Sequence, residues 1–198
     1  MFEHKIDVLS VGDVVTDAFI RLLPHEAEVT TNPKNHHPLL CMTFGTKVPF
    51  EKATIIKGVG NSPNAAVCFS RLGLNSSLYA NVGDDRVGED ILIALRANEV
   101  STEFVRVNKG MASNYHYVLW YDHERTILIN HEKYNYVLPD IKPKYIYLSS
   151  LGENIKECVF YGRDRGEVNV SSSIGTEKQF IKQEYNYLFV DGKWEIYY

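Results

Sequence analysis

Cysteine is scarce in this sequence of 198 residues, and its three copies are scattered at positions 41, 68 and 158. An odd number of widely spaced cysteines argues against a disulfide framework and against a zinc site. A chain of this composition fits a reducing compartment, and we therefore expect a cytoplasmic protein.

Long apolar runs and an excess of basic residues are missing as well. No uninterrupted apolar run approaches a membrane span, and the first residues lack a signal-peptide pattern, so we expect no membrane partner. The 21 basic and 25 acidic residues give a formal net charge of −4, which offers no basic footprint for nucleic acid. The hydrophobic content of 44% and the charged content of 23% are those of an ordinary globular protein. The length allows one full core, or one core with a small appendage.

The segment from Lys57 to Glu89 is rich in glycine and small residues, and it is the most informative part of the chain. Gly58 and Gly60 precede a small-residue helix, and glycine lets the backbone approach a ligand closely because it has no Cβ. Asn64 supplies an amide just inside the helix. The N-terminus of such a helix suits a polyhydroxylated or anionic ligand.

The ends of this helix are also marked in the sequence. Asn61 or Ser62 is predicted to cap its N-terminus, and Pro63 fits the first turn, where a missing N–H costs nothing. The apolar residues that follow recur at helical spacing, and Gly73 is predicted to end the helix.

Two aspartates follow the first predicted strand, Ile6–Val11. Asp13 and Asp17 come just past its carboxyl end, where open α/β sheets bind ligands. A turn aspartate followed by a solvated aspartate would explain the same pattern without any function.

The rest of the chain is predicted to alternate between strands and loops, with one more helix. The polar segment 24–38, which has three prolines, is predicted to be a loop or an excursion from the main fold. An amphipathic helix is expected over Ile91–Asn98, and hairpin turns over Asn108–Gly110 and Asp122–Arg125. The predicted strands are Phe19–Leu23, Leu39–Phe44, Ala53–Ile56, Ser77–Val82, Thr102–Val107, Asn114–Tyr121, Thr126–Asn130 and Lys144–Ser149, with a terminal hairpin of Tyr187–Val190 and Lys193–Tyr197 around Asp191 and Gly192.

The glycine-rich segment resembles the first signature of the ribokinase-like (PfkB) carbohydrate kinases. The resemblance is carried by the spacing of Gly60, Asn64, Ala66, Gly73 and Gly83. Two positions depart from the signature: Val59 stands where the first glycine of a pair is usual, and Ser62 where Gly, Ala or Pro is usual.

This resemblance implies an α/β fold, with a partial Rossmann-like sheet flanked by helices and a small β lid. Residues 1–153 would be the N-terminal part of the ribokinase-like domain, with the lid formed by about 19–57 and 107–131, and residues 154–198 stay unassigned. The ligand would be a sugar or nucleoside, and the chain could form a homodimer through the lid. The substrate-binding candidates are Asp13, Asp17, Gly60, Asn61 and Asn64, with Asp17 matching the aspartate that binds sugar hydroxyls in the family.

The family's second signature, a GAGD-like run, is missing from the sequence, since no alanine follows Ala112. In the family its N–H groups hold the transferring phosphate and its aspartate is the catalytic base. The runs at 162–166 and 173–175 are poor substitutes, so no catalytic, nucleotide-binding or metal residue is assigned, although the family uses ATP and Mg²⁺.

We therefore expect a truncated kinase that keeps the sugar-binding half, lacks the ATP half and is inactive alone. Three alternatives stay open. The phosphate site could be divergent and lie in the tail, or the domain could bind a sugar or nucleoside, or dimerise, without turnover. Residues 58–65 could also be a dinucleotide fingerprint, although such a fingerprint should directly follow the first strand.

Overall fold

The computed structural model describes residues 6–137, 139, 141 and 143–149, and the backbone of two further strands at 187–190 and 193–196. The chain divides into two compact units. The first unit comprises Met1–Val15, Lys57–Asn114 and His131–Tyr198, and the second comprises Thr16–Ile56 and Tyr115–Asn130.

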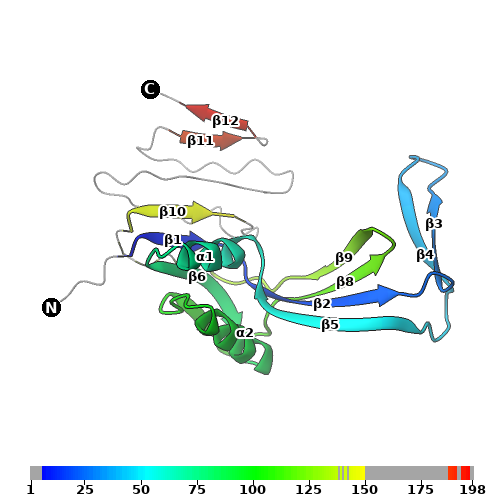
Figure 1. Cartoon of the computed structure of the whole chain (residues 1–198), viewed down its shortest axis with the longest axis horizontal. Helices are drawn as coiled ribbons and strands as arrows, with labels where there is room; N and C mark the ends of the chain where they lie inside the picture. The colour runs from blue at the N-terminus through cyan, green and yellow to red at the C-terminus, as the bar shows by residue number, and fades with distance from the viewer. Residues whose placement is uncertain are drawn as a thin grey trace. The chain divides into compact units, whose positions relative to one another are not determined.

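The first unit contains a parallel sheet with the strand order β10-β1-β6-β7. Its strands are β1 (Val8–Val11), β6 (Ser76–Gly83), β7 (Val105–Asn108) and β10 (Tyr145–Leu148). Every residue of β6 is buried, because a central strand of a parallel sheet is covered on both faces. Figure 1 shows β1 between β10 and β6, so its carboxyl end lies between theirs.

Both helices of the described residues, α1 (Asn61–Arg71) and α2 (Arg86–Ala97), belong to the first unit and pack against β6. Their contact is a core in which alternate residues of β6 meet one stripe of each helix. Its buried members are Val14, Ala66, Leu78, Ala80, Val82, Ile91, Leu95, Val100 and Val105.

The opposite face of the parallel sheet is covered differently. Tyr79 of β6 belongs to a second buried cluster with Tyr134 and Tyr136, which lie in a segment without helix or strand. The same cluster takes in Leu9, Val11 and Leu148. The backbone N–H of Val137 donates to the Tyr79 hydroxyl at 2.8 Å, which satisfies this buried polar atom.

The second unit contains a mixed sheet with the strand order β5-β2-β8-β9 and a separate two-stranded ribbon. Strands β2 and β8 are parallel, β8 and β9 form an antiparallel hairpin, and the ribbon pairs β3 with β4. The bounds are β2 (Val15–Leu22), β3 (Ala27–Thr31), β4 (Pro38–Met42), β5 (Phe50–Val59), β8 (Tyr115–Tyr121) and β9 (Glu124–Asn130).

Three local predictions were wrong. The predicted loop 24–38 contains β3, whose mostly exposed residues bury too little to leave a hydrophobic pattern. Strand β7 does not form a hairpin with the segment that follows it, because it pairs in parallel with β6. Helix α2 begins at Arg86, earlier than the predicted Ile91.

The other predicted strands are confirmed, and so is the α/β fold class. The terminal hairpin is confirmed as β11 (Tyr187–Val190) and β12 (Lys193–Ile196), while its turn residues Asp191 and Gly192 lie outside the described residues. The runs 162–166 and 173–175 also lie outside them. Among the described helices, none has the length and apolar character needed to cross a membrane.

Candidate functional site

The carboxyl end of β1 is tied to β10 and to the start of α1 by a buried serine. The Ser62 hydroxyl donates to the carbonyl oxygen of Val11 at 2.7 Å, and it lies 2.9 Å from the Ser149 hydroxyl. Gly12 makes this approach possible, because a Cβ there would stand 1.8 Å from the Ser149 carbonyl oxygen. Ser62, one of the two departures from the signature, therefore has a structural role.

Asp13 lies beyond this end of β1 and is only 6% exposed. Its carboxylate accepts a hydrogen bond from the Tyr136 hydroxyl, and Oδ2 lies 3.6 Å from Nδ1 of His131. A buried carboxylate needs such partners, because leaving it unpaired would be costly. Asp13 thus sits where the sequence places it, with its acceptor capacity partly used by the protein itself.

Gly60 is the residue immediately before α1 and has φ 128° and ψ 173°. The prediction that Asn61 or Ser62 caps the helix was wrong, since Gly60 occupies the cap and no side chain caps the N-terminus. An added Cβ at Gly60 would also lie 3.0 Å from the carbonyl oxygen of Asp13. Asp13 and Gly60 are therefore brought together, and only glycine fits there without strain.

Asn61 and Asn64 follow in the first turn of α1, and both are exposed. They lie three residues apart, so they share one face of the helix. The backbone N–H of Asn64 donates to Gly60 at 3.0 Å, which begins the helical bonding. Two amide side chains beside the positive end of the helix dipole can hydrogen-bond a hydroxylated or anionic ligand.

Asp17, the remaining substrate-binding candidate, belongs to the second unit and lies on β2. Its side chain is 20% exposed, and Oδ1 lies 3.2 Å from Nδ1 of His116 on the neighbouring strand β8. Residue 116 was not singled out from the sequence, because only the register of β2 and β8 places it opposite Asp17. The same holds for Tyr136 and His131, whose nearness to Asp13 depends on tertiary structure.

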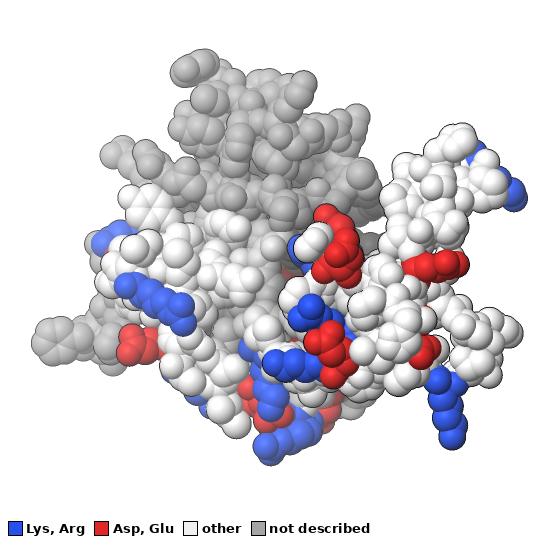
Figure 2. All heavy atoms as spheres, turned by 45° about the vertical axis from the view of Figure 1, so that its right-hand side comes forward, with Lys and Arg blue, Asp and Glu red and all other residues white. Residues whose placement is uncertain are grey.

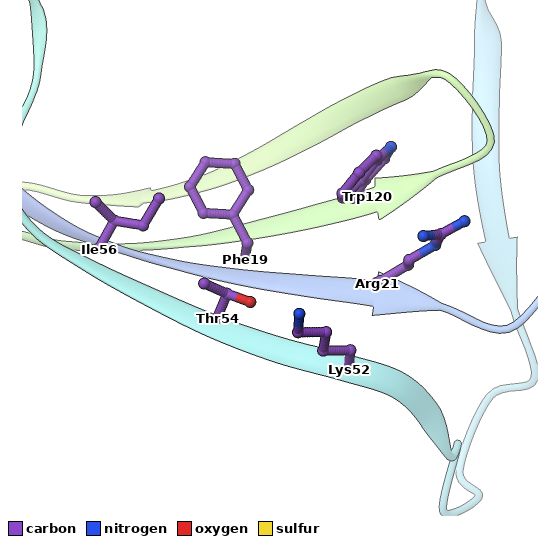
Figure 3. A pocket seen from close by; sticks show the side chains of 6 residues that line it. All are labelled: Phe19, Arg21, Lys52, Thr54, Ile56 and Trp120. Atoms are coloured by element: carbon purple, nitrogen blue, oxygen red, sulfur yellow. The ribbon is translucent and has the colours of Figure 1, made fainter.

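A groove of about 460 Å³ lies on one face of the sheet in the second unit. Figure 3 shows Phe19 and Arg21 from β2, Lys52, Thr54 and Ile56 from β5, and Trp120 from β8 around it. The Arg21 guanidinium lies 5.1 Å from the centre of the Trp120 ring and pairs with Glu51 at 3.1 Å. Two aromatic side chains of β8 are therefore partly exposed to solvent, Trp120 by 41% and Tyr117 by 50%.

The second glycine turn, between β6 and α2, is held together by Asp85. Oδ1 accepts from the Gly88 N–H at 2.8 Å and from the Ser113 hydroxyl at 2.6 Å, and Oδ2 accepts from the Ser113 N–H at 2.9 Å. Partial burial raises the pKa of Asp85, but the bonds from Ser113 and Gly88 outweigh it and hold this pKa below the ordinary aspartate value. The turn is therefore structural.

On the face shown in Figure 2, Lys and Arg side chains lie beside Asp and Glu side chains, so that face has no patch of a single sign. Among the residues described, no three His, Cys, Asp or Glu side chains could together hold a metal ion.

A parallel sheet with helices on it, a glycine-led helix at its carboxyl edge and a separate small β unit define the class of α/β proteins with a ribokinase-like fold. Solved structures agree: ribokinase from Arabidopsis thaliana complexed with ribose and ATP matches with a TM-score of 0.58 and 17% identity, over 77% of this chain and 48% of that one. The nucleoside kinase of Methanocaldococcus jannaschii matches with a TM-score of 0.59 and 14% identity, over 84% of this chain and 52% of that one. Ribokinase from Cryptococcus neoformans, in complex with ADP, matches with a TM-score of 0.51 and 22% identity, over 73% of this chain and 41% of that one.

The model of the pfkB family of carbohydrate kinases matches residues 47–174, which is more than half of the chain. The chain therefore belongs to the pfkB carbohydrate kinase family. It spans about half the length of the solved structures it matches. No curated protein sequence matches it.

The dinucleotide alternative does not fit the observed topology. Residues 58–65 begin in the last two residues of β5, which lies in the mixed sheet and not in the parallel one. A dinucleotide fingerprint joins a strand of the parallel sheet directly to its helix.

Proposed function

We propose that this chain carries the acceptor-binding half of a pfkB-family kinase and binds a sugar or a nucleoside. The observation that carries the proposal is the state of Asp17: Oδ1 is buried beside His116, while the side chain as a whole keeps 20% of its surface exposed. A carboxylate held at one oxygen can accept hydroxyl hydrogen bonds at the other. Gly60, Asn61 and Asn64 belong to the first unit and are separate candidates for ligand binding, with the open backbone and the amides of the α1 N-terminus.

We further propose that the chain does not transfer phosphate by itself. In-line transfer requires a base for the acceptor hydroxyl and a set of donors for the γ-phosphate. The family's GAGD-like run supplies both, and the sequence has no such run. The ATP and Mg²⁺ that the family uses would then be bound by residues that these 198 do not supply.

Calorimetry with D-ribose, D-fructose and adenosine tests the binding proposal. Asp17→Asn should weaken binding of the recognised probe by at least tenfold, as expected when a hydrogen bond to a charged group worth about 1.5–3 kcal/mol is lost. Asp122→Asn is the matched control, because Asp122 lies in the same unit at the β8–β9 turn with its side chain 72% exposed. Equal affinity in the wild type and in Asp17→Asn would refute the assignment.

A coupled ADP-release assay with Mg²⁺-ATP and the same acceptors tests the second proposal. We expect turnover at the background level, because loss of a general base alone removes about 10²–10⁴-fold. Acceptor-dependent ADP release that survives removal of contaminating kinases would show that the chain has a phosphate site.

Self-association through the second unit is a further candidate function, and one feature of its sheet favours it. The face that carries the groove exposes Ile56 (43%), Trp120 (41%), Ile127 (40%) and Ile129 (65%). We propose that a second copy of the chain covers this apolar face. Sedimentation should show a dimer that Ile129→Lys dissociates, whereas Leu128→Lys, on the opposite face of β9, should leave it intact. A wild-type monomer at all concentrations would exclude this role.

A further inference from the structure

Asp17 and His116 form a polar pair within the second unit. Strands β2 and β8 run parallel, and their register places His116 directly beside Asp17, so both side chains project from the same face of the sheet. Nδ1 of His116 lies 3.2 Å from Oδ1 of Asp17, and the two side chains are only 14% and 20% exposed. The pair is therefore largely withdrawn from water.

The nearest neighbours of this pair along β2, β8 and β9 are apolar. On the same face, the next positions along β2 and β8 are Phe19 and Val118, which are opposite each other, and Ile129 of β9 is opposite His116. The nearest charged groups along these strands are Arg21, which pairs with Glu51, and Arg125, opposite Trp120. No other basic group of the described residues lies within ion-pairing distance of Asp17.

Oδ1 of Asp17 is buried and has no well-aligned hydrogen bond within the described part of the chain. A buried carboxylate oxygen without a donor is costly, and a small rotation of the His116 ring would supply one. The distance of 3.2 Å already allows this bond.

We propose that His116 is a positioning residue for acceptor binding, whose Nδ1–H holds Oδ1 of Asp17 and leaves Oδ2 to accept from a ligand hydroxyl. This inference rests on the proposed function of Asp17. Holding one oxygen fixes the rotamer of the carboxylate before the ligand arrives, so less side-chain entropy is lost on binding. His116 itself does not contact the ligand in this arrangement.

Two substitutions at His116 separate positioning from packing. His116→Leu fills the space with an apolar side chain of moderate size and removes the hydrogen-bond donor. His116→Asn places an amide N–H close to the position of Nδ1. In calorimetry with D-ribose and adenosine, His116→Leu should weaken binding on the order of tenfold, and His116→Asn should restore most of it. His123→Leu is the control, because the His123 side chain is 94% exposed and lies in the same sheet unit.

A measurement without ligand tests the contact directly and does not depend on His116→Leu folding. Long-range ¹H–¹⁵N spectra of the histidine rings should show a proton on Nδ1 of His116 in the wild type, and its signal should change in Asp17→Ala. An Nδ1 without a proton, or a signal that Asp17→Ala leaves unchanged, would overturn the inference.

The two proposals fail in different ways. If Asp17→Asn weakens binding but His116→Leu does not, the positioning role is refuted and the proposed function stands. If neither probe depends on Asp17, the proposed function fails, while an Nδ1 proton that responds to Asp17→Ala still supports the pairing of the two residues.

Discussion

Removal of the Asp85 carboxylate is the sharpest test of how the first unit is held together. Asp85 caps α2 through the Gly88 N–H, and it also accepts from both the N–H and the hydroxyl of Ser113, 28 residues further along the chain. The Ser113 hydroxyl in turn accepts from the Gly83 N–H at 2.9 Å. One carboxylate thus links the end of β6, the start of α2 and the segment that leads into β8.

The magnitude for Asp85→Ala follows from these bonds. Losing the helix cap costs about 0.5–2 kcal/mol. Ser113 is only 5% exposed, so its N–H is left without a partner away from water, which costs about 1–3 kcal/mol more. The expected total of roughly 3 kcal/mol is a large part of the 5–15 kcal/mol that is typical of a folded domain.

Urea unfolding followed by circular dichroism at a helical wavelength measures this effect in the first unit, because both described helices lie there. Asp84→Ala is the control: Asp84 is exposed and accepts one bond, from the Gly110 N–H at 2.9 Å, so about 0.5–1.5 kcal/mol is expected. Equal losses in the two variants would refute the idea that Asp85 links the three segments.

Three other predictions follow from the described contacts. Because the pKa of Asp85 is lower in the folded protein, its ionised carboxylate stabilises the fold above the unfolded-state pKa of about 3.8, and this stabilisation is lost as pH falls through the folded-state pKa. The difference in unfolding free energy between the wild type and Asp85→Asn should therefore shrink in acid titrations below about pH 4. In urea unfolding, Gly12→Ala should destabilise the protein far more than Gly73→Ala, because a Cβ at Gly12 would lie 1.8 Å from a backbone oxygen. A Cβ at Gly73 would meet no atom within 4 Å, and the positive φ of 84° is the one source of strain there. Tyr136→Phe should cost about 1.5–3 kcal/mol in the same assay by removing a donor from buried Asp13, and a loss below 0.5 kcal/mol would contradict that bond's importance.

The sequence predicted the elements whose pattern is local. Strands such as β6 and β10 are short apolar runs, and α1 combines helical spacing with the glycines that flank it. Family spacing from Asn64 onward pointed to the right family, which the match over 47–174 establishes. The exposed strand β3 was missed, because a ribbon that buries little leaves no hydrophobic signal.

The candidate site also combines residues that the sequence identifies with contacts that only the folded chain forms. Asp13 and Gly60 could be found from the sequence, because a residue after a strand and a glycine before a helix have recognisable local positions. Their contact, with Asp13 beneath the space that Gly60 leaves open, depends on packing between segments 47 residues apart.

Only the tertiary structure decided the partners of the two aspartates. Tyr136 reaches Asp13 across 123 positions of sequence, and His116 meets Asp17 because β2 and β8 pair in one particular register. A shift of that register by one residue would move His116 to the other face of the sheet, since side chains alternate along a strand. Composition and local spacing specify which residues can accept or donate a hydrogen bond, whereas long-range strand pairing decides which of them meet.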